Sequence, residues 1–299
     1  MKTGHIVDCF NTELKTFFNK RYWWALIFIF LIPVIFIFDS FSGNGHFLYE
    51  DYKLISFSNP DYIHDFTSIT DDIDSIYNAY APGMAFNNSM AMLVVFGLLL
   101  VPMLFTLYAC SEYRSKVNRY KNVSLPRERV LAKISVCAGV LFASMVVYSI
   151  FYYAVSYFCW GKYLSSMFEK HGYQPKVMDI GLEKNIKCFL AAYFILLFYS
   201  VFGMLISFLS RSSITSVIVT VVVYFTRIPF GFSPSRNFSN VLSNAFYSNE
   251  SSSFSFDMLE KSDHSVSLSI VILMVYFVLM LTAVFLTGNI RKNRNKTNI

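Results

Sequence analysis

Six stretches of this chain contain no charged residue and are long enough, or nearly so, to cross a membrane as a helix. About 20 apolar residues in helical conformation span the roughly 30 Å hydrocarbon core of a bilayer. The stretches cover residues 22–38, 90–109, 134–157, 188–210, 212–226 and 266–288. Only 15% of the 299 residues are charged, whereas soluble domains carry roughly 25%. We therefore expect an all-α integral membrane protein with six transmembrane helices, folded as a single transmembrane domain over residues 1–299.

The fifth stretch, 212–226, is the shortest of the six, and helix-breaking residues follow it. Pro229, Gly231 and Pro234 interrupt an otherwise apolar sequence. Irregular backbone at membrane depth is tolerated only where protein or a water-filled cavity satisfies its polar groups. We therefore predict a broken or re-entrant segment between the fifth and sixth spans, over residues 227–236, that lines the outer mouth of the protein.

The distribution of Lys and Arg predicts the orientation of the chain. Basic residues concentrate on the cytoplasmic side of membrane proteins, most clearly in short connecting segments. Most of the 25 Lys and Arg residues lie in segments 1–21 and 110–133, around Arg211, and in 289–299. Segment 39–89 is rich in acidic residues, and Lys53 is its one basic residue. We therefore expect both termini in the cytoplasm, an acidic extracellular loop over 39–89 and location in the cell (plasma) membrane; the abundance of Lys, Asn, Ile, Phe and Tyr indicates a bacterial source.

The six apolar stretches contain no Asp, Glu, Lys, Arg or His. Ionisable residues within a bilayer usually mark proton relays, ion sites or voltage sensors, so their absence disfavours a proton- or sodium-coupled carrier. The chain also lacks the nucleotide-binding motif GxxxxGK(S/T), the metalloprotease motif HExxH and the esterase motif GxSxG. We therefore expect no enzymatic activity and no cofactor in this chain itself.

Cysteine and histidine positions do not indicate a metal site. The five cysteines form no CxxC pair. Their spacing therefore indicates neither a zinc knuckle nor a disulfide framework. His64 lies between Asp61 and Asp65, which are residue types that can ligate zinc. No compact histidine cluster accompanies them, so we interpret His64 as a solvated loop residue. The net charge of +6 follows from the basic connectors and requires no nucleic-acid partner.

Residues 1–21 have the pattern of an amphipathic helix. Apolar residues recur at helical spacing, and polar residues alternate with them on the opposite face. The apolar positions are Ile6, Phe10, Leu14, Phe17 and Phe18, and the polar positions are Asp8, Thr12, Lys15 and Asn19. Such a helix suits the membrane interface, and we expect it on the cytoplasmic side; the alternative is a helix packed against another protein surface.

The connector between the second and third spans, residues 110–133, carries seven basic and two acidic residues. Tyr113, Val117 and Tyr120 are spaced four and three residues apart, which places them on one face of a charged helix. Pro126, two residues after Ser124, indicates the start of a second helix that continues into the third span. Two interpretations are open: the charge keeps the connector in the cytoplasm, or the first helix docks on a partner.

This arrangement resembles the ABC-2 type permease family, the membrane subunits of ATP-binding-cassette exporters. The family pattern is a Glu after the second span, a basic amphipathic helix, a turn with Pro and Arg, and a Lys that opens the third span. In this chain the pattern corresponds to Glu112, residues 113–120, Pro126-Arg127-Glu128-Arg129 and Lys133. Ser115 and Lys116 stand where the family usually has Gly-Thr.

The resemblance implies one half of an exporter. Two six-helix permease subunits, identical or siblings, would join two separate ATPase subunits that bind ATP and Mg²⁺, with membrane lipids around them. Glu112, Tyr113, Val117, Tyr120 and Arg127 would form the cytoplasmic coupling helix and its turn, in contact with the ATPase. The aromatic spans suit amphipathic or apolar cargo such as a peptide, a lipid or a drug, but ordinary packing against lipid and at the membrane interface is the simpler explanation for these aromatic residues. The alternatives are a secondary carrier or channel without an ATPase, and a membrane scaffold or sensor that uses loop 39–89.

Overall fold

The computed structural model describes residues 3–35, 74, 78, 81–112, 127–158, 180–210, 212–225, 232–246 and 263–296. The described elements are all helical, which confirms the all-α expectation for these parts of the chain. They are α1 (Thr3–Asn19), the helix Tyr22–Ile35, α4 (Pro82–Ala109), the 3₁₀ turn η1 (Cys110–Glu112), α6 (Arg127–Phe158), α8 (Leu182–Ser210), α9 (Ser213–Phe225), α10 (Pro234–Ala245) and α11 (Val266–Lys296).

Four helices are long and apolar enough to cross a membrane: α4, the Glu128–Phe158 part of α6, α8, and the Val266–Ala283 part of α11. A fifth span results if α1 and the helix Tyr22–Ile35, which meet at a bend of 66°, are taken as one broken span. Helix α9 has 13 residues and is about 20 Å long, too short to cross alone. The described parts are therefore those of a multi-pass membrane protein, and the sixth span stays a prediction.

Helices α4, α6 and α8 begin earlier than the apolar stretches from which they were predicted. Helix α4 starts at Pro82, so residues 82–89 of the segment predicted as a loop over 39–89 are helical. Asn87, Asn88 and Ser89 lie buried in the early turns of α4. Apolar stretches locate only the part of a helix that suits lipid, whereas polar residues with buried partners can extend the same helix.

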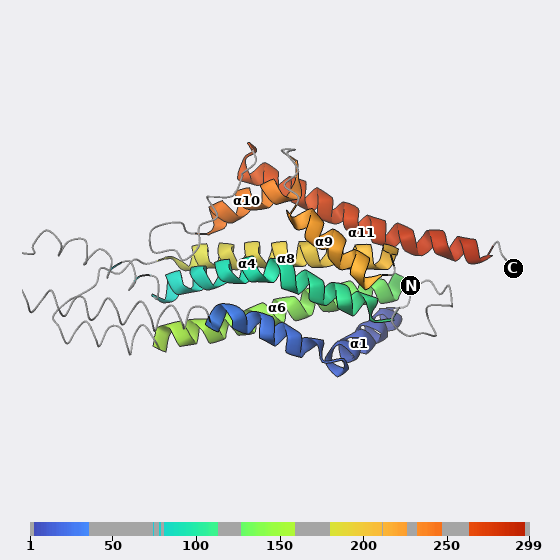
Figure 1. The fold of residues 1–299 in the computed structure, drawn as a ribbon, viewed down its shortest axis with the longest axis horizontal. Helices are drawn as coiled ribbons and strands as arrows, with labels where there is room; N and C mark the ends of the chain where they lie inside the picture. The colour runs from blue at the N-terminus through green and yellow to red at the C-terminus, as the bar shows by residue number, and fades with distance from the viewer. Residues whose placement is uncertain are drawn as a thin grey trace, which may run out of the picture.

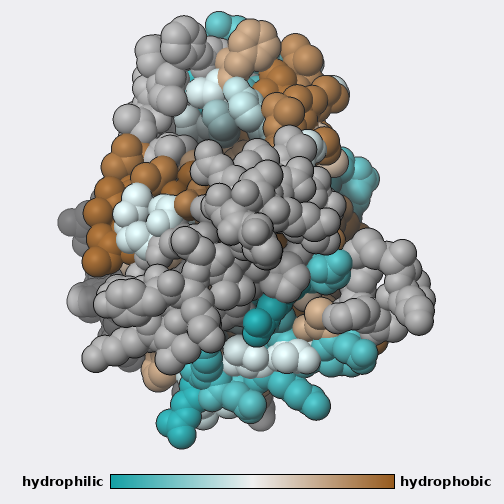
Figure 2. Space-filling view, turned by 90° about the vertical axis from the view of Figure 1, so that its right-hand side faces the viewer, coloured by the Kyte–Doolittle hydropathy of each residue, from teal (hydrophilic) through white to brown (hydrophobic). Residues whose placement is uncertain are grey.

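Both chain termini lie at the same end of the helix bundle (Figure 1). At this end, which we call the N/C end, α4 and α8 finish and α6 and α9 begin. Helices α4 and α8 form the centre, with α6 and α1 on one side and α9, α10 and α11 on the other (Figure 1). Viewed from the N/C end, hydrophilic surface gathers along the lower edge, where α1 lies (Figure 2). The opposite end of the bundle is called the far end below.

Small residues allow the central helices to approach closely. A side-chain carbon at Gly97 would lie 3.1 Å from Leu196 of α8, and one at Gly203 would clash with Thr106 of α4. Close packing of this kind is the main attraction between helices in lipid, where burial of apolar surface gives little. The large apolar side chains that remain exposed, such as Val147, are compatible with contact to lipid tails.

Candidate functional site

Helix α1 buries one face against the N/C end of the bundle. The ring of Phe17 is fully buried, and Phe10 and Leu14 pack partly buried against the core. The polar face is exposed as predicted, with Asp8, Thr12, Lys15 and Asn19 in contact with solvent. Phe18 does not join the buried face, because its side chain is 47% exposed; α1 packs on α6 with a narrower stripe than the sequence predicts.

The buried face of α1 also carries a carboxylate. Glu13 is 0% exposed, and its Oε1 lies 2.7 Å from Nε of Arg129, while its Oε2 lies 2.9 Å from Nζ of Lys133. Lys133 is itself 0% exposed, whereas the side chain of Arg129 is 41% exposed. Because Arg129 and Lys133 are four residues apart on α6, they occupy one face of the helix, and both cations reach the same carboxylate.

Tyr108, near the end of α4, completes this cluster. Its hydroxyl donates to Oε2 of Glu13 over 3.1 Å and lies 3.2 Å from the backbone oxygen of Glu13. Nζ of Lys133 lies 4.3 Å from the centre of the Tyr108 ring, within the range of a cation–π interaction. The ring of Phe17 packs edge-on against Tyr108 at 5.3 Å between centroids. We call Glu13, Tyr108, Arg129 and Lys133 the Glu13 junction.

The Glu13 junction joins three helices by charge. Taking ions out of water costs several kcal/mol per ion, and a buried pair is stable only when geometry and additional hydrogen bonds compensate. Here the carboxylate meets two cations and a hydroxyl, and Lys133 meets both a carboxylate and an aromatic face. Removal of Glu13 would leave Lys133 buried without its carboxylate, and removal of Lys133 would weaken the compensation of Glu13, so the junction favours one arrangement of α1, α4 and α6.

Sequence reasoning missed Glu13 and Tyr108. A signal for Glu13 was present, because it lies three residues after Phe10 and four before Phe17, on the apolar face of the helix. A charged residue at such a position needs a buried partner. The partners lie 116 and 120 residues later in the chain, and no local pattern identifies them.

The predicted coupling residues lie where the connector leaves and re-enters the described structure. Glu112 ends η1, and Arg127 is the first residue of α6, both at the N/C end (Figure 1). Tyr113, Val117 and Tyr120 lie outside the described residues. The exit of the connector is tied to α8, because Sγ of Cys110 and Oγ of Ser207 share a hydrogen bond of 2.6 Å.

Of the three residues predicted to line the outer mouth, one lies among the described residues and two lie outside them. Pro234 is the first residue of α10, and Ser233 before it caps the helix, its hydroxyl accepting from the backbone N–H of Arg236 over 3.5 Å. Proline is favoured here because a backbone N–H in the first turn of a helix has no acceptor within the helix, so its absence loses no hydrogen bond. Pro229 and Gly231 lie outside the described residues.

Helix α10 is bound to its neighbours by hydrogen bonds from neutral side chains and by one exposed bond from the Lys184 ammonium to the backbone oxygen of Asn244, over 2.8 Å. Nδ2 of Asn240 donates to the backbone oxygen of His264 over 2.6 Å and to Oγ of Ser269 over 3.0 Å. Sγ of Cys188, on α8, donates to the backbone oxygen of Ala245 over 3.1 Å. The helix therefore connects α8 and α11 towards the far end, and Figure 1 shows it lying alongside the start of α11.

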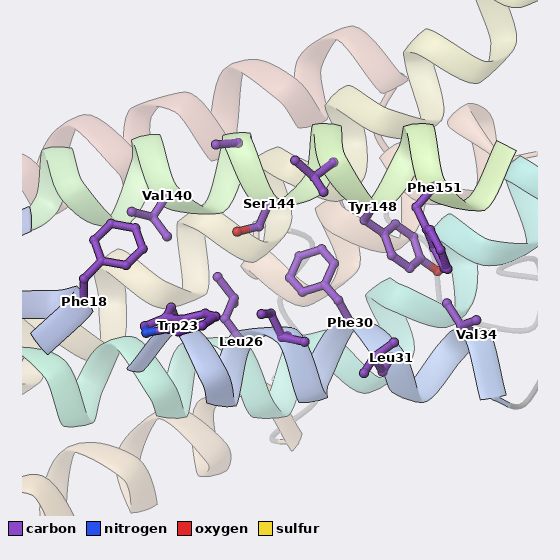
Figure 3. A pocket seen from close by; sticks show the side chains of 13 residues that line it. Phe18, Trp23, Leu26, Phe30, Leu31, Val34, Val140, Ser144, Tyr148 and Phe151 are labelled. Atoms are coloured by element: carbon purple, nitrogen blue, oxygen red, sulfur yellow. The ribbon is translucent and has the colours of Figure 1, made fainter. Parts of the chain in front are cut away.

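An apolar groove runs between the helix Tyr22–Ile35 and α6 (Figure 3). Its volume is about 340 Å³. The residues that line it are Phe18, Trp23, Leu26, Ile27, Phe30, Leu31, Val34, Val140, Ala143, Ser144, Val147, Tyr148 and Phe151. Leu26, Phe30, Val34 and Tyr148 are buried, whereas Val147 and others remain exposed at the rim. We call this the lateral groove, because it opens on the side of the bundle and not at its ends.

No three His, Cys, Asp or Glu side chains in the described ranges gather into a group that could hold a metal ion. What the ranges do contain is a charged junction at the N/C end, the neutral hydrogen bonds of Asn240 towards the far end and the lateral groove. Comparison with family models, curated proteins and solved structures finds no match for this chain.

Proposed function

We propose that this chain is the membrane permease subunit of an ATP-binding-cassette exporter of the ABC-2 type. The observation that carries the proposal is the Glu13 junction, which binds α1 to α6 close to the point where the connector enters α6. Force applied to the connector reaches α6 through continuous helix and α1 through two ion pairs. This is the linkage that a subunit driven from the cytoplasm requires.

In the proposed mechanism the energy comes from a partner. A separate ATPase pair binds ATP and Mg²⁺ and closes, the helix around Tyr113–Tyr120 moves with it, and the spans redirect a central cavity towards the outside. Tyr113, Val117 and Tyr120 are the buried anchors of this contact, and Glu112 pairs with a basic group on the ATPase. The apolar stretches contain no ionisable residue, which agrees with an energy source outside the membrane.

The proposed assembly has six spans per subunit, with both termini in the cytoplasm of a bacterium, and it contains a second copy or a sibling permease. The segments rich in Lys and Arg all meet the N/C end (Figure 1), which supports placing that end in the cytoplasm. Helix α9 and the segment that includes Pro229 and Gly231 form the broken fifth span. The cargo is an amphipathic or apolar molecule: a peptide, a lipid or a drug.

Co-purification tests the proposal. The unsubstituted chain should retain an ATPase of the Walker type from its own host. Tyr113→Ala with Tyr120→Ala should release it, because aromatic side chains in a desolvated pocket often contribute about 2 kcal/mol or more each to an interface. Lys116→Gln with Lys121→Gln is the matched control and should retain the ATPase, because exposed rim charges contribute little. Failure of the unsubstituted chain to retain any ATPase would favour a carrier or scaffold.

Labelling of single cysteines in intact cells tests the orientation. Cysteines at Asn118 and Asn293 should be protected from a membrane-impermeant reagent, and cysteines at Asp65 and Ser251 should react with it. Labelling at Asn118 from outside would overturn the orientation and the coupling role of the connector together.

A further inference from the structure

We propose that the lateral groove binds one acyl chain of an anionic membrane phospholipid, with the lipid phosphate held by Lys20 and Arg21. The proposal rests on the chain being a membrane protein and not on its being an exporter. It assigns a binding site to a surface that the proposed transport cycle does not use.

The shape and chemistry of the lateral groove fit a hydrocarbon chain. Val140 to Phe151 line it along α6, a distance of about 16 Å at the rise of a helix. Three lining side chains carry a polar group: the hydroxyls of Ser144 and Tyr148 and the ring nitrogen of Trp23. The Tyr148 hydroxyl lies 3.5 Å from the backbone oxygen of Ser89. The volume of about 340 Å³ lies within the range of ligand pockets, roughly 300–1,000 Å³. A polar ligand would find few partners there.

Two basic residues lie in the chain next to the end of the lateral groove nearest α1. Phe18 and Trp23 line the groove at this end (Figure 3), and between them in the chain lie Lys20 and Arg21, both exposed. From residue 15 to residue 35 the chain has basic residues and no acidic ones. Basic groups at the membrane surface attract anionic lipid head groups, and the groove leads from that point along two helices that are apolar.

The backbone at this turn is unusual. Arg21 has a φ of 60°, in the left-handed region that few residues other than glycine adopt. Its backbone N–H donates to the oxygen of Phe18 over 3.0 Å, and its own oxygen accepts from the N–H of Trp24 over 3.1 Å. Arg21 therefore links the last turn of α1 to the first turn of the next helix, at the bend of 66°. Strained positions of this kind often mark ligand sites. Here the position is occupied by arginine, although glycine would adopt the same backbone conformation without strain.

A second copy of this chain fits the lateral groove less well. A twofold axis through the groove would bring the same surface of both copies together. The two basic turns would then approach each other without an acidic partner in residues 15–35 of either chain. The lipid is the occupant that matches both the apolar length and the charge.

Quenching of tryptophan fluorescence by brominated lipids tests the proposal. The chain has three tryptophans, so Trp24→Phe with Trp160→Phe leaves Trp23, which lines the groove, as the only reporter. The protein is placed in nanodiscs of phosphatidylcholine that contain a minority of either phosphatidylglycerol or phosphatidylcholine brominated on its acyl chains. We expect brominated phosphatidylglycerol to associate at least about fivefold more strongly, which is the factor that one basic residue near a membrane contributes.

Two sets of variants separate the head-group and acyl-chain contacts. Lys20→Gln with Arg21→Gln should make the two brominated lipids equivalent. Ser144→Phe should fill the groove and reduce quenching by both lipids, and Ala143→Phe serves the same purpose if that variant fails to fold. Ala154→Phe is the matched control, because Ala154 is exposed on the same helix outside the groove, and it should change nothing.

Equal quenching by the two lipids in the chain with Lys20 and Arg21 intact would overturn the proposed head-group site. Quenching that persists unchanged in folded Ser144→Phe and Ala143→Phe would overturn the acyl-chain site. Protection of Trp23 from both lipids would show that protein covers the groove, and this outcome also overturns the proposal. None of these results depends on an ATPase or on transport.

Discussion

The two ends of the bundle bury polar groups in opposite ways. At the N/C end the buried carboxylate of Glu13 meets two cations, Arg129 at 2.7 Å and the buried Lys133 at 2.9 Å. At the far end the buried amide of Asn240, a neutral group, donates to a backbone oxygen and to the hydroxyl of Ser269. A buried ion depends strongly on its partner, whereas each neutral hydrogen bond contributes about 1 kcal/mol. The N/C end is therefore built as an all-or-none linkage, and the far end is held by small, separate contributions.

The largest expected effect comes from removing one ion of the Glu13 junction. Glu13→Gln leaves Lys133 buried beside a neutral amide, and the loss of a partner from a buried pair costs about 3–5 kcal/mol of unfolding free energy. The double variant Glu13→Gln with Lys133→Met should be less destabilised than the sum of its single variants, because no buried charge is left alone. Denaturation in mixed micelles measures both, with Asp8→Asn on the exposed face of α1 as the control. Additive losses would show that the two ions act independently.

The next effect is expected where α4 and α8 cross between the two ends. Gly203→Ala places a carbon against Thr106 and should lower the unfolding free energy by about 2 kcal/mol, because overpacking forces backbones apart. Gly139→Ala is the matched control, since no atom lies within 4 Å of the added carbon. It should stabilise α6 by up to about 1 kcal/mol, the difference in helix propensity. Equal effects of the two substitutions would show that the central contact is loose.

A smaller effect is expected at the neutral amide of Asn240. Asn240→Ala removes the amide that donates to the backbone oxygen of His264 and to the hydroxyl of Ser269. We expect the unfolding free energy to fall by about 1 kcal/mol. Asn244→Ala, at an exposed position on the same helix, should have no effect on the unfolding midpoint. A loss as large as that of Glu13→Gln would remove the contrast between the two ends.

The smallest effect tests whether charge matters at the far end. Glu183 and Lys187 form an ion pair of 2.6 Å on α8, four residues apart, with both side chains largely exposed. Exposed pairs contribute little because water screens them and ordering two long side chains is unfavourable. Glu183→Gln should leave the unfolding midpoint unchanged at low and at high salt. A clear salt-dependent shift would mean that ions stabilise both ends.

Much of the helical framework was predictable from the sequence alone. Apolar stretches located α4, α6, α8 and α11, because a helix facing lipid must be apolar over its full crossing length. The amphipathic pattern of residues 1–21 located α1 and its exposed face, since helical periodicity is a local property. The short fifth stretch matched α9, which ends at Phe225. These features depend only on neighbours within a few turns of the same helix.

The start of α4 and the turn at Arg21 were not predictable in this way. Polar residues such as Asn87 extend α4 beyond its apolar stretch because Cys188, a residue on another helix, donates to its side-chain oxygen over 3.1 Å. The left-handed conformation of Arg21 has no signal in the residue type, because arginine rarely adopts it. A contact that crosses the bundle therefore accounts for the start of α4.

The same division holds for the candidate site. The sequence by itself determined that a basic connector joins two apolar helices, that α1 is amphipathic, and that the apolar stretches are free of charge. Only the tertiary structure decided that Glu13 turns inward to meet Arg129 and Lys133, and that the helix Tyr22–Ile35 and α6 leave a groove between them. The physical reason is that a charge on an apolar face requires a buried partner, but the local sequence does not identify which residue that partner is. Packing across more than a hundred residues of chain makes that choice.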